Sequence, residues 1–288
     1  MASGARKWLV GCGIGCLMVL LAFGGIGTCG YLGIRKAKER VDRMEAGYAD
    51  LQAVYGPVSD FRPWPGGAVP ADRLEMFLAV RDAMAPARGK LGGNLGTLGG
   101  KGDDAGNILR KFGAGANVVP SIFTFMEARN TALADHGMGP GEYVYLYTLT
   151  YYAWLRHDPE ERPEFMRDED ERSDRHGQFT WTVGRHGRDV SGDDEGASGE
   201  QPMRELHRLH LAMLENQRQD ARAAGADESW LAALDAQCER LEADPYALMW
   251  TDGLPEVVTA SLEPWRDRLE ASWSPATNVL EWDMFNDE

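Results

Sequence analysis

Hydrophobic and polar positions divide the chain into regions with three different patterns. Residues 8–34 form an apolar stretch without a charged side chain, WLVGCGIGCLMVLLAFGGIGTCGYLGI. Such a stretch is long enough for a helix to cross the roughly 30 Å hydrocarbon core of a bilayer. Further along, apolar residues recur at helical spacing, except in residues 158–201, which are charged and nearly free of aliphatic side chains. The pattern predicts a mainly α-helical protein with a single N-terminal transmembrane helix, a helical-bundle-like soluble domain and a disordered acidic insert.

The boundaries between these regions follow from local breaks in the pattern. Helical spacing after the apolar stretch ends at Gly56-Pro57. Phe61 and Trp64 in the proline-rich connector that follows are expected to dock on the domain, because large aromatic side chains are seldom left in solvent. We expect a basic tail at 1–7, a transmembrane helix at 8–34, a juxtamembrane helical stem at 35–55, a connector at 56–70, one α-helical domain formed by 71–157 and 202–288, and a charged insert at 158–201.

Proline and glycine interrupt the helical pattern in the first half of the domain. Pro86 is expected to kink or end the helix that opens after Pro70. Glycine costs about 1 kcal/mol per helical position relative to alanine, so the glycine-rich residues 91–100 are expected to form a marginal helix or a flexible connector. The next helix is predicted to begin at Asn117, with Pro120 near its start, and Gly137 suits the left-handed position that ends a helix.

The second half of the domain shows clearer helix signals. Met203–Ala224 has a strong apolar stripe, Asp227 is placed to cap the next helix, and Asp244-Pro245 closes it. Pro264 interrupts a final apolar stripe, which predicts a kink or two short helices. These signals predict a helical hairpin followed by shorter helices.

Two further segments each allow two interpretations. Gln178 to Val183, within the charged insert, alternates apolar and polar residues and is expected to form a short strand or a docking strip. The acidic tail from Asn278 to Glu288 is expected either to bind a partner or to pack on its own domain, and the sequence favours neither.

Tyr143 to Leu155, YVYLYTLTYYAWL, is the most distinctive segment outside the apolar stretch. Its composition favours a strand, but as a helix it places Tyr143, Tyr147, Tyr151 and Trp154 on one face. Helical neighbours on both sides favour the helix. Those four residues then form a ligand pocket or partner groove, or else a core helix whose hydroxyls bond to backbone or water, which is the commoner case for aromatic stripes.

The apolar stretch allows three interpretations, of which we favour an uncleaved anchor. A cleaved signal peptide would have a shorter apolar core, and lipoprotein attachment at Cys12 or Cys29 would lack a suitable preceding sequence. The small residues are spaced in two pairs, which would let two membrane helices approach closely; the pairs are Gly11 with Gly15 and Gly24 with Thr28. This spacing predicts a homodimer through the span, although glycine-rich segments also produce it by chance.

Charge and cysteine usage add location and exclude one class of partner. The basic residues between Arg35 and Arg43 outnumber Arg6 and Lys7, so the positive-inside rule puts the body in the cytoplasm, while a short cytoplasmic N-terminus would put it outside. The formal net charge of −15 argues against nucleic acid, whose phosphates need clustered cations. Three of the four cysteines lie in the apolar stretch, which leaves no pair for a disulfide within the domain. Lysine is absent after Lys111 while arginine is plentiful, which suggests a GC-rich bacterial source.

Chemical motifs are sparse. His207 and His210 lie one helical turn apart and could share a metal ion, but zinc sites use three or four protein ligands and HExxH is absent. No nucleophile elbow and no cofactor-binding motif occurs, so we expect no cofactor and do not expect an enzyme. The leading hypothesis is a membrane-anchored interaction or scaffold protein with an unknown protein partner. The alternatives are a small-ligand sensor built on the Tyr143–Trp154 helix and, more remotely, a metal-dependent enzyme at the two histidines.

Overall fold

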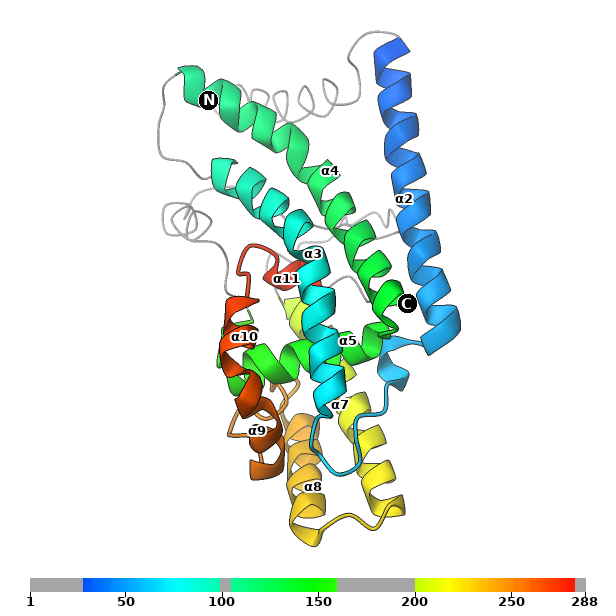
Figure 1. Cartoon of the computed structure of the whole chain (residues 1–288), viewed down its shortest axis with the longest axis vertical. Coiled ribbons are helices and arrows are strands. Elements are labelled where there is room, and N and C mark those ends of the chain that lie inside the picture. Colours follow the sequence, from blue (N-terminus) through cyan, green and yellow to red (C-terminus); the bar gives the residue numbers. More distant parts are fainter. Residues whose placement is uncertain (1–27, 99–104, 160–199, 283–288) are drawn as a thin grey trace, which may run out of the picture.

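The computed structural model describes residues 28–98, 105–159 and 200–282 (Figure 1), and within these ranges the chain is mainly helical and has no strand. The prediction of a mainly α-helical fold is therefore confirmed. The elements are α2 (Thr28–Tyr55), η1 (Val58–Asp60), α3 (Ala71–Leu98), α4 (Ala105–His136), α5 (Pro140–Tyr147), η2 (Thr148–Trp154), α7 (Glu200–Ala223), α8 (Glu228–Ala243), α9 (Glu256–Leu262), η3 (Glu263–Trp265), α10 (Arg266–Ala271) and α11 (Asn278–Trp282).

Most of the predicted membrane span lies outside the described residues. Only its last part, from Thr28 onward, is seen, as the beginning of α2. Among the helices that are described, none combines the length and the apolar character that crossing a bilayer requires. Gly11, Gly15 and Gly24, the predicted helix-packing positions, also lie outside the described ranges, as does the possible strand from Gln178 to Val183.

Helices α3 and α4 form a long antiparallel pair, and α2 lies along α4 on its other side (Figure 1). The structure corrects a helix end at Pro86 and a helix start at Asn117. Helix α3 continues through Pro86 and the following glycines to Leu98, and α4 begins at Ala105 rather than at Asn117. Leu91 and Leu95 of α3 are buried. Burial of apolar side chains between two long helices outweighs the weak local propensity of this stretch.

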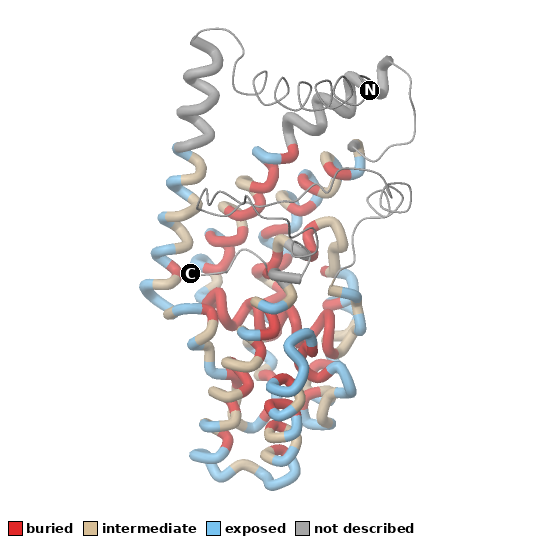
Figure 2. Tube along the Cα trace, turned by 180° about the vertical axis from the view of Figure 1, so that it is seen from behind, coloured by how far each residue is buried: buried red, intermediate tan, exposed pale blue. Residues whose placement is uncertain are grey.

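Helix α5 and the π-helix η2 that continues it pass through the centre of the molecule. Their backbone is helical from Pro140 to Trp154, so the helical prediction for this segment is confirmed and the strand alternative is wrong. Every residue from Pro140 to Ala153 is buried. Gly141 allows the connector to cross α5 closely, because a Cβ atom there would lie 2.6 Å from the Val58 carbonyl oxygen. Figure 2 shows the buried residues concentrated around this centre.

The connector docks as the sequence predicts. The rings of Phe61 and Trp64 pack against Tyr145 of α5, with centroid distances of 5.6 and 6.1 Å. Gln217 of α7 donates a hydrogen bond to the Trp64 carbonyl at 2.9 Å, and Trp230 of α8 donates through its indole nitrogen to the Pro65 carbonyl at 2.7 Å. The helical hairpin of α7 and α8 is thereby joined to the first half of the chain.

Local stop and start signals are confirmed in the second half. The Asp227 carboxylate accepts a hydrogen bond from the Ser229 backbone at 2.8 Å and caps α8. Pro264 lies in the 3-10 turn η3, which separates α9 from α10. The tail packs back on its own domain as far as Trp282, which is buried in α11.

Candidate functional site

The tyrosine face of α5 and η2 lies inside the core. Tyr143, Tyr147 and Tyr151 have no measurable exposure, and their hydroxyls bond to other side chains of the protein. Tyr143 donates to Glu281 at 2.7 Å and Tyr147 donates to Asn278 at 3.0 Å. A hydrogen bond of 2.6 Å joins the hydroxyls of Tyr151 and Ser272. Neither of the two cavities described below is lined by these tyrosines.

Trp154, the fourth residue of the predicted face, differs from the three tyrosines in its solvent exposure. It is partly exposed, and the Arg266 guanidinium lies 4.4 Å from its ring centroid. That arrangement is a cation–π contact at the surface. Trp154 therefore packs at the edge of the core and not within it.

A buried ion pair connects the tyrosines to the C-terminal helix. Arg81 of α3 and Glu281 of α11 are both fully buried, and Arg81 Nη1 lies 2.8 Å from Glu281 Oε1. Burial, the largest single effect, lowers the pKa of Arg81. The charge of Glu281 and the surrounding tyrosines together outweigh it, so the net pKa is raised well above the usual value. The guanidinium also lies 5.2 Å from the ring centroids of Tyr147 and Tyr151. No local pattern in the sequence identifies this pair, because 200 positions separate its members.

The two predicted histidines are buried against the segment that follows α8. His207 Nδ1 donates to the Ala247 carbonyl at 2.9 Å, and His210 Nδ1 accepts from the Met249 backbone at 3.5 Å. Burial, with a smaller contribution from His207, lowers the pKa of His210 to about 3. The part of the chain that the structure describes contains no group of three His, Cys, Asp or Glu side chains able to hold a metal ion. The described residues thus supply no third ligand.

Cys238 of α8 is a buried thiol. Burial raises its pKa to about 11, so it carries almost no thiolate at neutral pH. Since the thiolate is the reactive form, this side chain is poorly suited to act as a nucleophile.

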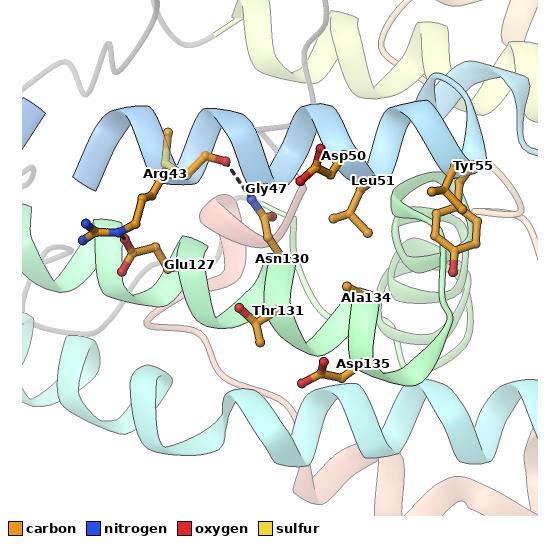
Figure 3. Close-up of a pocket in the computed structure, with 12 residues that line it drawn as sticks. Arg43, Gly47, Asp50, Leu51, Tyr55, Glu127, Asn130, Thr131, Ala134 and Asp135 are labelled. Carbon is orange, nitrogen blue, oxygen red and sulfur yellow. Dashed lines mark hydrogen bonds and ion pairs between the residues drawn. The ribbon is translucent and has the colours of Figure 1, made fainter. Parts of the chain in front are cut away.

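A groove runs between α2 and α4 (Figure 3) and has a volume of about 570 Å³. Arg43 of α2 forms an ion pair with Glu127 of α4 at 3.3 Å, and Asn130 donates to the Met44 carbonyl at 3.2 Å. These contacts join the two walls at one end of the groove. The complete lining is Arg43, Met44, Gly47, Asp50, Leu51, Val54, Tyr55, Glu127, Asn130, Thr131, Ala134 and Asp135.

The groove combines an apolar surface with acidic edges. Leu51 is buried at its base, whereas Val54 is 73% and Tyr55 40% exposed, so the groove presents apolar side chains to solvent. Asp50 on α2 and Asp135 on α4 are exposed on opposite walls, and neither forms an ion pair within the described part of the chain. Helical spacing alone did not identify this site, because it arises only where two separate helices face each other.

Comparison of the chain with protein-family models, with curated proteins and with solved structures finds no match.

Proposed function

We propose that this protein is a membrane-anchored α-helical interaction module that binds a cationic amphipathic segment of a partner protein in the α2–α4 groove. The observation that carries the proposal is that one wall of the groove lies next to the apolar stretch in the sequence. Helix α2, which forms one wall, begins at Thr28, immediately after residues 8–27 of the apolar sequence. Anchoring by that sequence would hold the groove close to the bilayer.

The chemistry of the groove supports a cationic partner. An amphipathic helix can bury its apolar face in such a groove, as in helix-in-groove recognition. Val54 and Tyr55 offer apolar contact, and the carboxylates of Asp50 and Asp135 lie where Lys or Arg side chains at the edge of that helix would reach. Opposite charges at a rim increase the association rate and select the partner more than they increase affinity.

The remaining parts of the proposal concern the membrane. We propose that residues 8–34 span the cell membrane once, that the body faces the cytoplasm, and that Gly11, Gly15, Gly24 and Thr28 allow two spans to pair. The alternatives receive less support. A ligand sensor needs the tyrosines of α5 to face a cavity, and a metal enzyme needs a third ligand beside His207 and His210.

Site-specific photo-crosslinking in the full-length protein in its native membrane tests the groove. A photoreactive amino acid replaces Val54 in the groove or, as a control, Tyr246, which is 44% exposed outside the groove. We expect a crosslinked product from position 54 only, attached to a peptide that is cationic and amphipathic. The double variant Asp50→Asn, Asp135→Asn should reduce its yield several-fold, whereas Asp82→Asn, on the exposed surface of α3, should not.

Three outcomes would count against this function. Equal products from positions 54 and 246 would show that the groove is not selective. A crosslinked peptide that is acidic or uniformly polar would contradict the proposed chemistry of the partner. Absence of any product from position 54 in membranes that contain the protein would remove the groove as a binding site.

A further inference from the structure

The C-terminal half of α3 contains a second buried guanidinium, next to the Arg81–Glu281 pair. Arg88 is only 8% exposed and lies two helical turns beyond Arg81. Its Nη1 donates to the Ser272 carbonyl at 2.6 Å and its Nη2 donates to the Arg81 carbonyl at 2.6 Å. Within the described part of the chain Arg88 forms no ion pair. The carboxylate of the neighbouring pair, Glu281, is bonded to Arg81.

Arg88 therefore donates only to neutral carbonyl groups, and the Glu281 carboxylate that attracts it from nearby is already paired with Arg81. Burial, and then the positive charge of Arg81, lower the pKa of Arg88, and the attraction of Glu281 offsets this only in part, so the charged form is disfavoured where it lies. A buried charge without an ion-pair partner of its own is destabilising, and carbonyl groups offset only part of that cost. A guanidinium has five N–H donors, so Arg88 can make further hydrogen bonds beyond the two to carbonyls.

Arg88 also borders a surface depression of about 270 Å³ between α3 and the segment that follows α10. On the α3 side the lining consists of small residues, Ala85, Gly89 and Gly92. On the other side it includes Trp273 and Ser274. The Trp273 ring is held in place by parallel stacking on His157, with centroids 4.2 Å apart. Small walls, a hydroxyl and a guanidinium together make a site of the size and charge that suit a small anion.

We propose that this depression binds a small oxyanion of the phosphate type, with Arg88 as the cation that recognises it. Arginine binds the oxygens of phosphate through parallel N–H groups, and charge-assisted hydrogen bonds of this kind are about twice as strong as neutral ones. The bound anion gives Arg88 an ion-pair partner of its own. The site lies apart from the α2–α4 groove and uses none of its residues, so it is independent of the proposed function.

The test measures thermal unfolding of the full-length protein, in detergent micelles, with inorganic phosphate and with chloride at equal ionic strength. Ala85→Glu places a carboxylate on the depression three residues before Arg88, at a spacing where side chains on a helix meet. Ala83→Glu is the matched control, since it adds the same charge at an exposed position of α3 outside the depression. Titration calorimetry with phosphate gives the affinity of each protein.

We expect phosphate, but not chloride, to raise the unfolding temperature of the unchanged protein and of Ala83→Glu. Ala85→Glu should unfold at a higher temperature than Ala83→Glu without phosphate and should bind phosphate at least tenfold more weakly, because its own carboxylate occupies Arg88. No phosphate effect on the unchanged protein, or equal phosphate affinity in the two glutamate variants, would overturn the proposal. Either result would assign Arg88 a structural role as a donor to the two carbonyls. A titration with acetate in place of phosphate distinguishes a preference for a planar oxyanion from a preference for a tetrahedral one. Higher affinity for acetate than for phosphate would also contradict the phosphate assignment.

Discussion

Removal from water controls the protonation of the polar side chains in the core. Tyr143 and Tyr147 lie among buried groups, and burial raises the pKa of both hydroxyls, so they stay protonated and act as hydrogen-bond donors to α11. Burial acts in the opposite direction on His210, a base, whose charged form is disfavoured. The aromatic and histidine residues that drew attention in the sequence therefore serve packing and internal hydrogen bonds.

His210 gives the first residue-scale prediction, a loss of stability in acid. Its pKa is about 3 in the folded chain, whereas an unfolded histidine has a pKa near 6.5. As the pH falls below about 6.5, the unfolded chain takes up a proton that the folded chain does not, so unfolding becomes more favourable until the pH approaches 3. Between pH 7 and pH 5 this histidine should lower the free energy of unfolding by about 2 kcal/mol.

Urea unfolding of the unchanged protein and of His210→Gln at pH 7, 6 and 5 checks this. The variant should lose less stability over that range. The difference between the two slopes of unfolding free energy against pH gives the contribution of the histidine, because the carboxylates contribute equally to both proteins. Val119→Gln, at a 48% exposed position of α4 that carries no titratable group, is the control and should keep the slope of the unchanged protein. Identical slopes for all three proteins would contradict a buried neutral His210.

At the scale of elements, the closeness of neighbours decides whether a glycine is required. A Cβ atom at Gly141 of α5 would lie 2.6 Å from the Val58 carbonyl oxygen and 2.7 Å from Phe61 Cβ. The same atom at Gly93 of α3 would meet nothing within 4 Å. The connector therefore crosses α5 at Gly141, whereas Gly93 lies on an open face of α3.

Alanine at the two positions should act in opposite directions. Gly141→Ala forces the connector away from α5 and should lower the free energy of unfolding by about 1–3 kcal/mol or more. Gly93→Ala improves helix propensity in open space and should raise it by up to about 1 kcal/mol. Urea unfolding at neutral pH measures both. A neutral result for Gly141→Ala would mean that η1 can shift without cost, against the packing described for the centre of the molecule.

At the scale of the whole molecule, charge is distributed unevenly along the chain. All six lysines lie at or before Lys111, and five arginines or lysines fall between Arg35 and Arg43, whereas the formal net charge of the chain is −15. Basic residues next to a membrane span mark the cytoplasmic side. A topology reporter fused after Glu288 should therefore report a cytoplasmic C-terminus.

Neutralising part of this basic segment tests the reason for the orientation. The triple variant Lys36→Gln, Lys38→Gln, Arg40→Gln should shift a measurable fraction of the reporter to the outside, because Arg6 and Lys7 would then balance the remaining charges. Replacement of three arginines far from the span, Arg204, Arg208 and Arg222, should leave the orientation unchanged. An external reporter in the unchanged protein would reverse the assignment and direct a partner search to the cell envelope.

The sequence by itself determined the helical nature of the domain and many helix ends. The Asp227 cap, the left-handed Gly137 and the interruption at Pro264 all act through hydrogen bonds and torsions within a few residues, so a local pattern suffices to predict them. The same local reasoning was wrong for a helix end at Pro86 and for the start of α4, where packing between α3 and α4 outweighs propensity.

Tertiary structure alone decided which helices meet and therefore where both candidate sites lie. The groove needs Asp50 and Asp135 on facing helices, and the depression needs Arg88 beside Trp273. It also decided that the acidic tail packs inward as far as Trp282, since Glu281 forms an ion pair with Arg81 across 200 positions. Contacts between distant segments depend on the simultaneous burial of many side chains, and no periodicity along the chain records that information.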